Sequence, residues 1–139
     1  MPIVTRWFIK TSLACFIAAL ALGLAEAARE PLGLPAVLVA AGPVYVHLLV
    51  VGWITQMIFG VAYWMFPKYS KESPRGSDRL AIASYVCLNV GLLLRVVGEP
   101  AHTLHPTASL GWALALSAVL QWLGGTAFVL NTWPRVKER

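Results

Sequence analysis

Three histidines and one arginine are the residues of this chain that could do chemistry within an otherwise apolar sequence. His47 and Arg95 each fall inside a long apolar run, and His102 and His105 follow shortly after Arg95. An ionisable side chain in such a run is costly and indicates a functional site by default. The competing interpretation is structural, because histidine can bond to water or a backbone carbonyl and Arg95 can pair with Glu99 four residues on.

Two kinds of site fit this set of residues. Neutral imidazole ligates haem iron, so His47 with His102 or His105 could hold a haem between two helices, and Arg95 could neutralise its propionates. Alternatively, His47, His102 and His105 could form a three-histidine copper or zinc site. The sequence contains no Cys-x-x-Cys-His motif, so we expect haem b, held without covalent attachment, and copper as the alternative.

The composition indicates which solvent surrounds these residues. Of the 139 residues, 58% are hydrophobic and only 12% are charged, and the mean hydropathy is +0.70. Soluble domains carry about twice that share of charge. The net charge of +5 does not indicate nucleic-acid binding, because the basic residues lie in short segments between apolar runs. We therefore predict an integral membrane protein in contact with the lipid bilayer.

The apolar runs predict an all-α, integral membrane four-helix bundle in a single domain. Pro43 suits the first turn of a helix, and Glu99-Pro100 is expected to end one. The predicted elements are a first span at 7–28, an outer loop at 29–42, a second span at 43–66, a cytoplasmic loop at 67–79, a third span at 80–98, an outer loop at 99–107, a fourth span at 108–133 and a basic tail at 134–139. A cleaved signal peptide ending near Ala25-Glu26-Ala27 is the alternative for the first span.

The distribution of basic residues predicts the orientation. With four spans, nine of the eleven Lys and Arg residues lie at one end of the bundle. Cytoplasmic loops carry the excess of positive charge, so both termini are predicted to be cytoplasmic, in a multi-pass protein of the cell inner (plasma) membrane. This orientation brings His47, Arg95, His102 and His105 to one level near the outer face.

Small and polar residues recur on one side of three of the predicted spans. Such stripes allow close approach between helices, and we interpret them as helix contacts in preference to ligand sites. The stripes are Gly52, Gln56, Gly60 and Tyr63 in the second span, Ser84, Cys87, Gly91, Arg95 and Gly98 in the third, and Ser117, Gln121 and Gly124 in the fourth.

The second span resembles helix II of subunit I of the haem-copper oxidases and the related nitric-oxide reductases. The resemblance rests on His47, Phe59-Gly60, Tyr63-Trp64 and Phe66-Pro67, and extends loosely over the next loop and span. It implies that His47 is an axial ligand of a low-spin haem. Members of that family have many more spans, which supply the remaining ligands. A second axial ligand would therefore come from His102, His105, a second copy or another subunit.

Together these features predict a small subunit of a membrane respiratory or electron-transfer complex. It would bind haem b near the outer face and pass electrons between a periplasmic donor such as a cytochrome and quinone or a partner subunit. The chain is too short to be a complete oxidase, so we expect at most an electron-transfer role. The alternatives are a haem-free scaffold or assembly factor docking a larger complex, and periplasmic copper delivery. Expected partners are lipid and other membrane subunits or further copies of the chain.

Overall fold

The computed structural model describes residues 1–136, and the regular structure in that part is entirely helical. The elements are α1 (Ile3–Ala27), the 3₁₀ helix η1 (Ala36–Ala41), α2 (Gly42–His47), the π-helix η2 (Leu48–Thr55), α3 (Gln56–Met65), α4 (Asp78–Leu104), α5 (Ala108–Thr132) and the 3₁₀ helix η3 (Trp133–Arg135). Four stretches of the described residues are long and apolar enough to cross a membrane, namely Ile3–Ala27, Leu38–Met65, Asp78–Leu104 and Ala108–Arg135. The prediction of an all-α chain with four candidate spans is confirmed.

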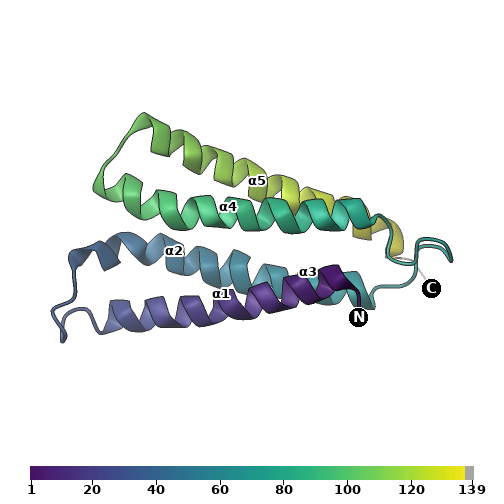
Figure 1. The fold of residues 1–139 in the computed structure, drawn as a ribbon, viewed down its shortest axis with the longest axis horizontal. Helices are drawn as coiled ribbons and strands as arrows, with labels where there is room; N and C mark the ends of the chain where they lie inside the picture. Colours follow the sequence, from purple (N-terminus) through teal and green to yellow (C-terminus); the bar gives the residue numbers. More distant parts are fainter. Residues whose placement is uncertain (137–139) are drawn as a thin grey trace.

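The helices form two antiparallel hairpins that lie side by side (Figure 1). In one hairpin α1 packs along η2 and α3, and in the other α4 packs along α5. The start of α1, the loop between α3 and α4, and η3 share one end of the bundle, which we call the basic end. The opposite end, called the histidine end, carries His47 and the connection from α4 to α5.

Apolar side chains point outward along the whole bundle. Exposed examples are Ile17, Leu24, Val97, Leu116 and Leu130. The buried set includes polar residues, among them Thr5, Ser12, Gln56, Ser84 and Ser117. This distribution is stable only where lipid replaces water as the solvent, because the outer surface would otherwise aggregate.

The second span begins earlier than predicted. Its helical stretch starts in η1, within the predicted outer loop at 29–42, and runs through Gly42-Pro43 into α2. Pro43 does not separate the two segments because it lies in the first turn of α2, where its missing N–H removes no necessary hydrogen bond. The first span likewise starts at Ile3, before the predicted residue 7.

The predicted end of the third span at residue 98 is wrong. α4 continues through Glu99-Pro100 to Leu104, so the predicted outer loop at 99–107 shortens to three residues before α5. A proline inside a helix removes one backbone hydrogen bond, which membrane helices tolerate when neighbouring groups compensate. Pro100 has no N–H to donate to the carbonyl of Val96; the bond from the Thr103 hydroxyl to the carbonyl of Glu99, at 2.8 Å, is a separate one in the next turn. His102 therefore lies within α4, and His105 is its C-terminal cap.

The stripes of small residues are helix contacts, as predicted. The Ser84 hydroxyl donates to the Gly124 carbonyl at 2.8 Å, and the Ser117 hydroxyl donates to the Gly91 carbonyl at 2.6 Å, which joins α4 to α5. In the other hairpin, a Cβ at Gly52 would lie 2.8 Å from Cys15 Cβ, and a Cβ at Gly60 would lie 2.8 Å from Phe8 Cβ. All these contacts are made within the chain.

A reciprocal amide pair joins the two hairpins in the middle of the bundle. Gln56 donates to Asn89 at 3.2 Å, and Asn89 donates back at 3.0 Å and also to the Tyr85 carbonyl at 2.8 Å. We expect Gln56→Leu and Asn89→Leu each to lower the free energy of unfolding by about 1 kcal/mol, since each removes a buried hydrogen-bond partner. The double variant should lose less than the sum, as measured by unfolding in detergent. Strict additivity would contradict a coupled pair.

Candidate functional site

His47 is the last residue of α2, and its ring makes one clear hydrogen bond. Its Nδ1 lies 2.8 Å from the carbonyl oxygen of Pro43, one turn earlier. A carbonyl can only accept, so in this bond a ring proton is on Nδ1, and in the neutral ring the lone pair is then on Nε2. Within residues 1–136 no hydrogen bond engages Nε2. The hydrogen bond to Pro43 fixes the ring, and the His47 side chain is still 26% exposed.

A π-helix follows His47 directly, from Leu48 to Thr55. π-Helical turns are rare and often occur at functional sites, because the wider turn changes the direction in which flanking side chains point. Gly52, in the middle of this segment, is held between α1 and α4, where a Cβ would lie 2.8 Å from Cys15 Cβ and 3.1 Å from Leu92 Cδ2. The segment is therefore fixed on both sides immediately after the histidine.

Arg95 has structural partners on α4 and α5. Its Nη1 donates to Glu99 Oε1 at 2.8 Å, and its Nε donates to the Ser117 hydroxyl at 3.4 Å. Gln121 adds a donor to the same hydroxyl at 3.2 Å. These contacts agree with the structural interpretation given above, in which Arg95 pairs with Glu99 four residues on. A haem propionate at Arg95 would have to share the guanidinium with Glu99.

Glu99 connects this ion pair to His47. Its Oε2 lies 3.8 Å from His47 Nδ1, which is outside hydrogen-bond range but close enough for an electrostatic interaction. Oε2 is buried and has no hydrogen-bond partner among the described residues, and the Glu99 side chain is only 11% exposed. The structure thus brings together His47, Arg95 and Glu99, from α2 and α4.

The other two predicted histidines lie at the C-terminal end of α4. His102 lies in the last turn of α4, with Nδ1 buried and without a hydrogen-bond partner in residues 1–136, and its Cε1 lies 4.0 Å from where a Cβ of Gly111 would be. His105 is exposed at the end of α4. In the described part of the chain no three His, Cys, Asp or Glu side chains are grouped to hold a metal. The geometry therefore gives no support to the copper or zinc alternative.

The residues at the histidine end fit haem in part. In its neutral form His47 has what an axial ligand needs, with Nε2 free and Nδ1–H bonded to a carbonyl. Ile54, in the π-helix after His47, is an exposed apolar side chain suited to a porphyrin face or to lipid, and Val51 packs partly against the core. Within residues 1–136, the side-chain polar contact of the His47 ring is to Glu99 and not to a second histidine.

The sequence interpretation missed three groups of this site. Glu99 was considered only as a partner of Arg95, and neither Ser117 nor the Pro43 carbonyl was assigned a part in it. The spacing of four between Pro43 and His47 was a usable signal for the carbonyl, because such residues lie one turn apart. The contact between Glu99 and His47 had no sequence signal, because it depends on how α2 packs against α4.

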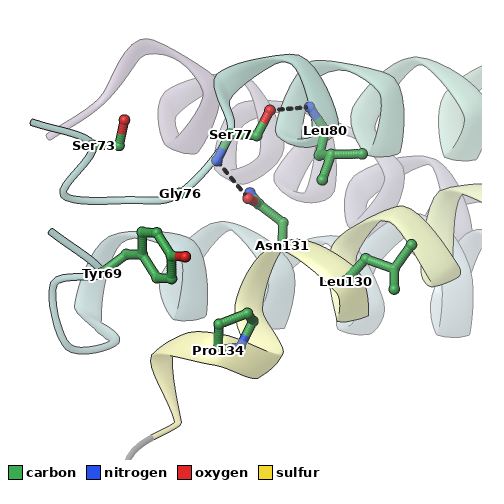
Figure 2. Close-up of a pocket in the computed structure, with 8 residues that line it drawn as sticks. All are labelled: Tyr69, Ser73, Gly76, Ser77, Leu80, Leu130, Asn131 and Pro134. Atoms are coloured by element: carbon green, nitrogen blue, oxygen red, sulfur yellow. Dashed lines mark hydrogen bonds between the residues drawn. The ribbon is translucent and has the colours of Figure 1, made fainter.

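A hollow of about 440 Å³ at the basic end is a rival candidate site (Figure 2). It is lined by Tyr69, Ser73, Gly76, Ser77, Leu80, Leu130, Asn131 and Pro134. Asn131 Oδ1 accepts from the backbone N–H of Ser77 at 2.7 Å and thereby ties α5 to the start of α4. Gly76, at a φ of +78°, leaves room for this contact. The lining offers hydroxyl and amide groups but no imidazole, carboxylate or thiol, so it is not suited to hold iron or copper.

Comparison with known proteins identifies no relative. No protein-family model, no curated protein and no solved structure matches the chain. The resemblance of the second span to haem-copper oxidase subunit I therefore stays a prediction based on its residues.

Proposed function

We propose that this chain is a small electron-transfer subunit of a membrane respiratory complex, and that it binds b-type haem through Nε2 of His47. One observation carries the proposal, the 2.8 Å hydrogen bond between His47 Nδ1 and the Pro43 carbonyl. Histidines that ligate metals almost always donate the other ring N–H to a carbonyl or carboxylate, which fixes the tautomer and the ring orientation.

The surrounding residues would prepare His47 for this role. The Pro43 carbonyl fixes the ring, and the Glu99 carboxylate at 3.8 Å from Nδ1 makes the imidazole a better electron donor. Arg95, held by Glu99 and Ser117, would share its guanidinium between Glu99 and a haem propionate. When bound, haem supplies a carrier of one electron. The chain's own contribution is ligation, orientation and a water-poor apolar surface.

The second axial ligand is part of the proposal. It would come from His102, His105, a second copy of the chain or another subunit. We place the site at the outer face, with both termini cytoplasmic, on the basis of the nine Lys and Arg residues that the sequence assigns to the cytoplasmic side. Electron exchange would then occur with a periplasmic donor and with quinone or a partner subunit.

The scaffold alternative is less well supported. A scaffold could dock a larger complex through the stripes of small residues, but Gly52, Gly60, Gly91 and Gly124 are all packed against helices of the same chain. Bulky substitutions at these glycines would disturb the bundle itself and would not test docking to another protein.

The proposal predicts a b-type reduced-minus-oxidised absorption spectrum for the purified protein. Haem should be present in a fixed ratio to the chain or to its dimer, and two imidazole ligands should give a low-spin spectrum. Extraction and quantification of the haem gives its ratio to the chain, and electron paramagnetic resonance gives its spin state. Purified protein from haem-replete cells that carries no haem, and binds none on addition, would overturn the proposal.

A further inference from the structure

A second hollow at the basic end is lined by three basic side chains. It measures about 300 Å³ and lies between the end of α3 and the following loop, with Lys68, Arg75 and Arg135 in its lining beside Trp64 and Phe66. No acidic side chain lines it within the described residues. Of the two carboxylates nearby in sequence, Glu72 is exposed outside the hollow, and Asp78 accepts a hydrogen bond from the Tyr63 hydroxyl at 2.7 Å. Three positive charges around one hollow attract an anion.

The three bases differ in how far the fold uses them. Arg135 is 1% exposed, and its guanidinium donates to the carbonyls of Tyr63, Phe66 and Pro67, so it is fully engaged in the fold. Arg75 makes no hydrogen bond within residues 1–136, and its Nε is buried without a partner. A buried N–H of a charged group is rarely left unpaired, because its lost hydration is then not replaced. Other atoms of the Arg75 side chain line the hollow, where an anion can reach them.

An apolar groove continues from this hollow along α3. The groove measures about 480 Å³ and is lined by Met57, Ile58, Val61, Ala62, Met65 and Phe66. Met65 and Phe66 line both the groove and the basic hollow, so the two are adjacent. The basic hollow lies at the end of a candidate span, and the apolar groove runs from it along the span. A phospholipid has the same arrangement, with a charged headgroup next to apolar acyl chains.

We propose that the hollow and the groove together bind one anionic phospholipid. Its phosphate would accept hydrogen bonds from Arg75 and form an ion pair with Lys68. One acyl chain would lie in the groove along α3. Arg135, Trp64 and Phe66 would form the boundary between head and tail, where aromatic rings are favoured in membranes. This site lies at the opposite end of the bundle from His47, so the proposal does not depend on haem binding.

Native mass spectrometry of the purified full chain tests the proposal, with phosphatidylglycerol and phosphatidylcholine of equal acyl chains supplied together. We expect the parent to retain phosphatidylglycerol at least about fivefold better, the effect of one well-placed basic residue. Lys68→Gln with Arg75→Gln should bring the ratio close to one. Lys71→Gln, which removes the same charge from an exposed residue outside the hollow, should leave the ratio unchanged. Lys68→Gln alone should lower the ratio in part, and it serves if the double variant does not fold.

The same experiment separates a lipid site from a site for free phosphate. Inorganic phosphate and glycerol phosphate at millimolar concentration should not displace phosphatidylglycerol, because the acyl chain contributes to binding. Displacement by either one would overturn the lipid assignment. Equal retention of both lipids by the parent, or an equal loss of preference in Lys71→Gln, would overturn the site.

Discussion

Alanine at Gly124 is expected to destabilise the bundle, whereas alanine at Gly125, the next residue of the same helix, is expected to stabilise it slightly. A Cβ at Gly124 would lie 2.8 Å from Leu88 Cγ and 3.1 Å from both Leu88 N and Ser84 O. Two of these atoms belong to the backbone of α4, so relief requires the helices to separate. Overpacking of this kind costs about 1 to 3 kcal/mol. The 2.8 Å bond from Ser84 to the Gly124 carbonyl would be weakened as well.

Gly125 is a matched control for this substitution. No atom of the described chain lies within 4 Å of a Cβ built there. Alanine is a better helix former than glycine by up to about 1 kcal/mol. Thermal unfolding in the same detergent, followed by circular dichroism, should therefore rank Gly125→Ala above the parent and Gly124→Ala well below it. Equal transitions for the two variants would contradict the close packing of α4 against α5.

Arg135→Met is expected to cause a loss of comparable or larger size. The guanidinium donates to three carbonyls at the end of α3, those of Tyr63 at 3.0 Å, Phe66 at 2.8 Å and Pro67 at 3.0 Å. The last carbonyls of a helix have no partner within it and need one elsewhere. Hydrogen bonds from a charged donor contribute about 1.5 to 3 kcal/mol each, so their joint removal should cost several kcal/mol. The guanidinium also lies over the rings of Tyr63 and Phe66.

Arg79→Met separates this capping role from a general effect of charge. Arg79 is exposed in the first turn of α4, at the same end of the bundle, and its replacement removes one positive charge as well. Unfolding in detergent should show a large loss of stability for Arg135→Met and little change for Arg79→Met. Similar losses for both variants would mean that Arg135 acts through the charge of the basic end and not through the carbonyls of α3.

The overall fold was largely predictable from the sequence. In a membrane the solvent is apolar, so the length of each apolar run decides where a span lies. The stripe formed by Gly52, Gln56 and Gly60 was predictable for the same reason, since small and polar residues in a membrane helix are concentrated where helices meet. Pro100 was the main source of error, because a proline that ends helices in water is accepted inside α4.

The site was only partly predictable. His47 and Arg95 stood out because ionisable residues in apolar runs are rare, and the pairing of Arg95 with Glu99 follows from their spacing. The π-helix after His47 and the 3.8 Å approach of Glu99 to the imidazole depend on the packing of α2 against α4. The basic hollow depends on residues 68, 75 and 135, which are far apart in sequence and meet only because η3 folds back onto the end of α3. No periodicity within one helix can predict such contacts.

The most direct test of the account is the haem content of His47→Ala compared with that of His105→Ala. Each protein is purified in the same way, and its haem per chain is measured with its reduced-minus-oxidised spectrum. We expect His47→Ala to lose the haem signal by at least about tenfold, because it removes the proposed iron ligand. His105→Ala should keep haem bound to His47, with at most a change of spin state. An undiminished low-spin spectrum in His47→Ala would contradict the account.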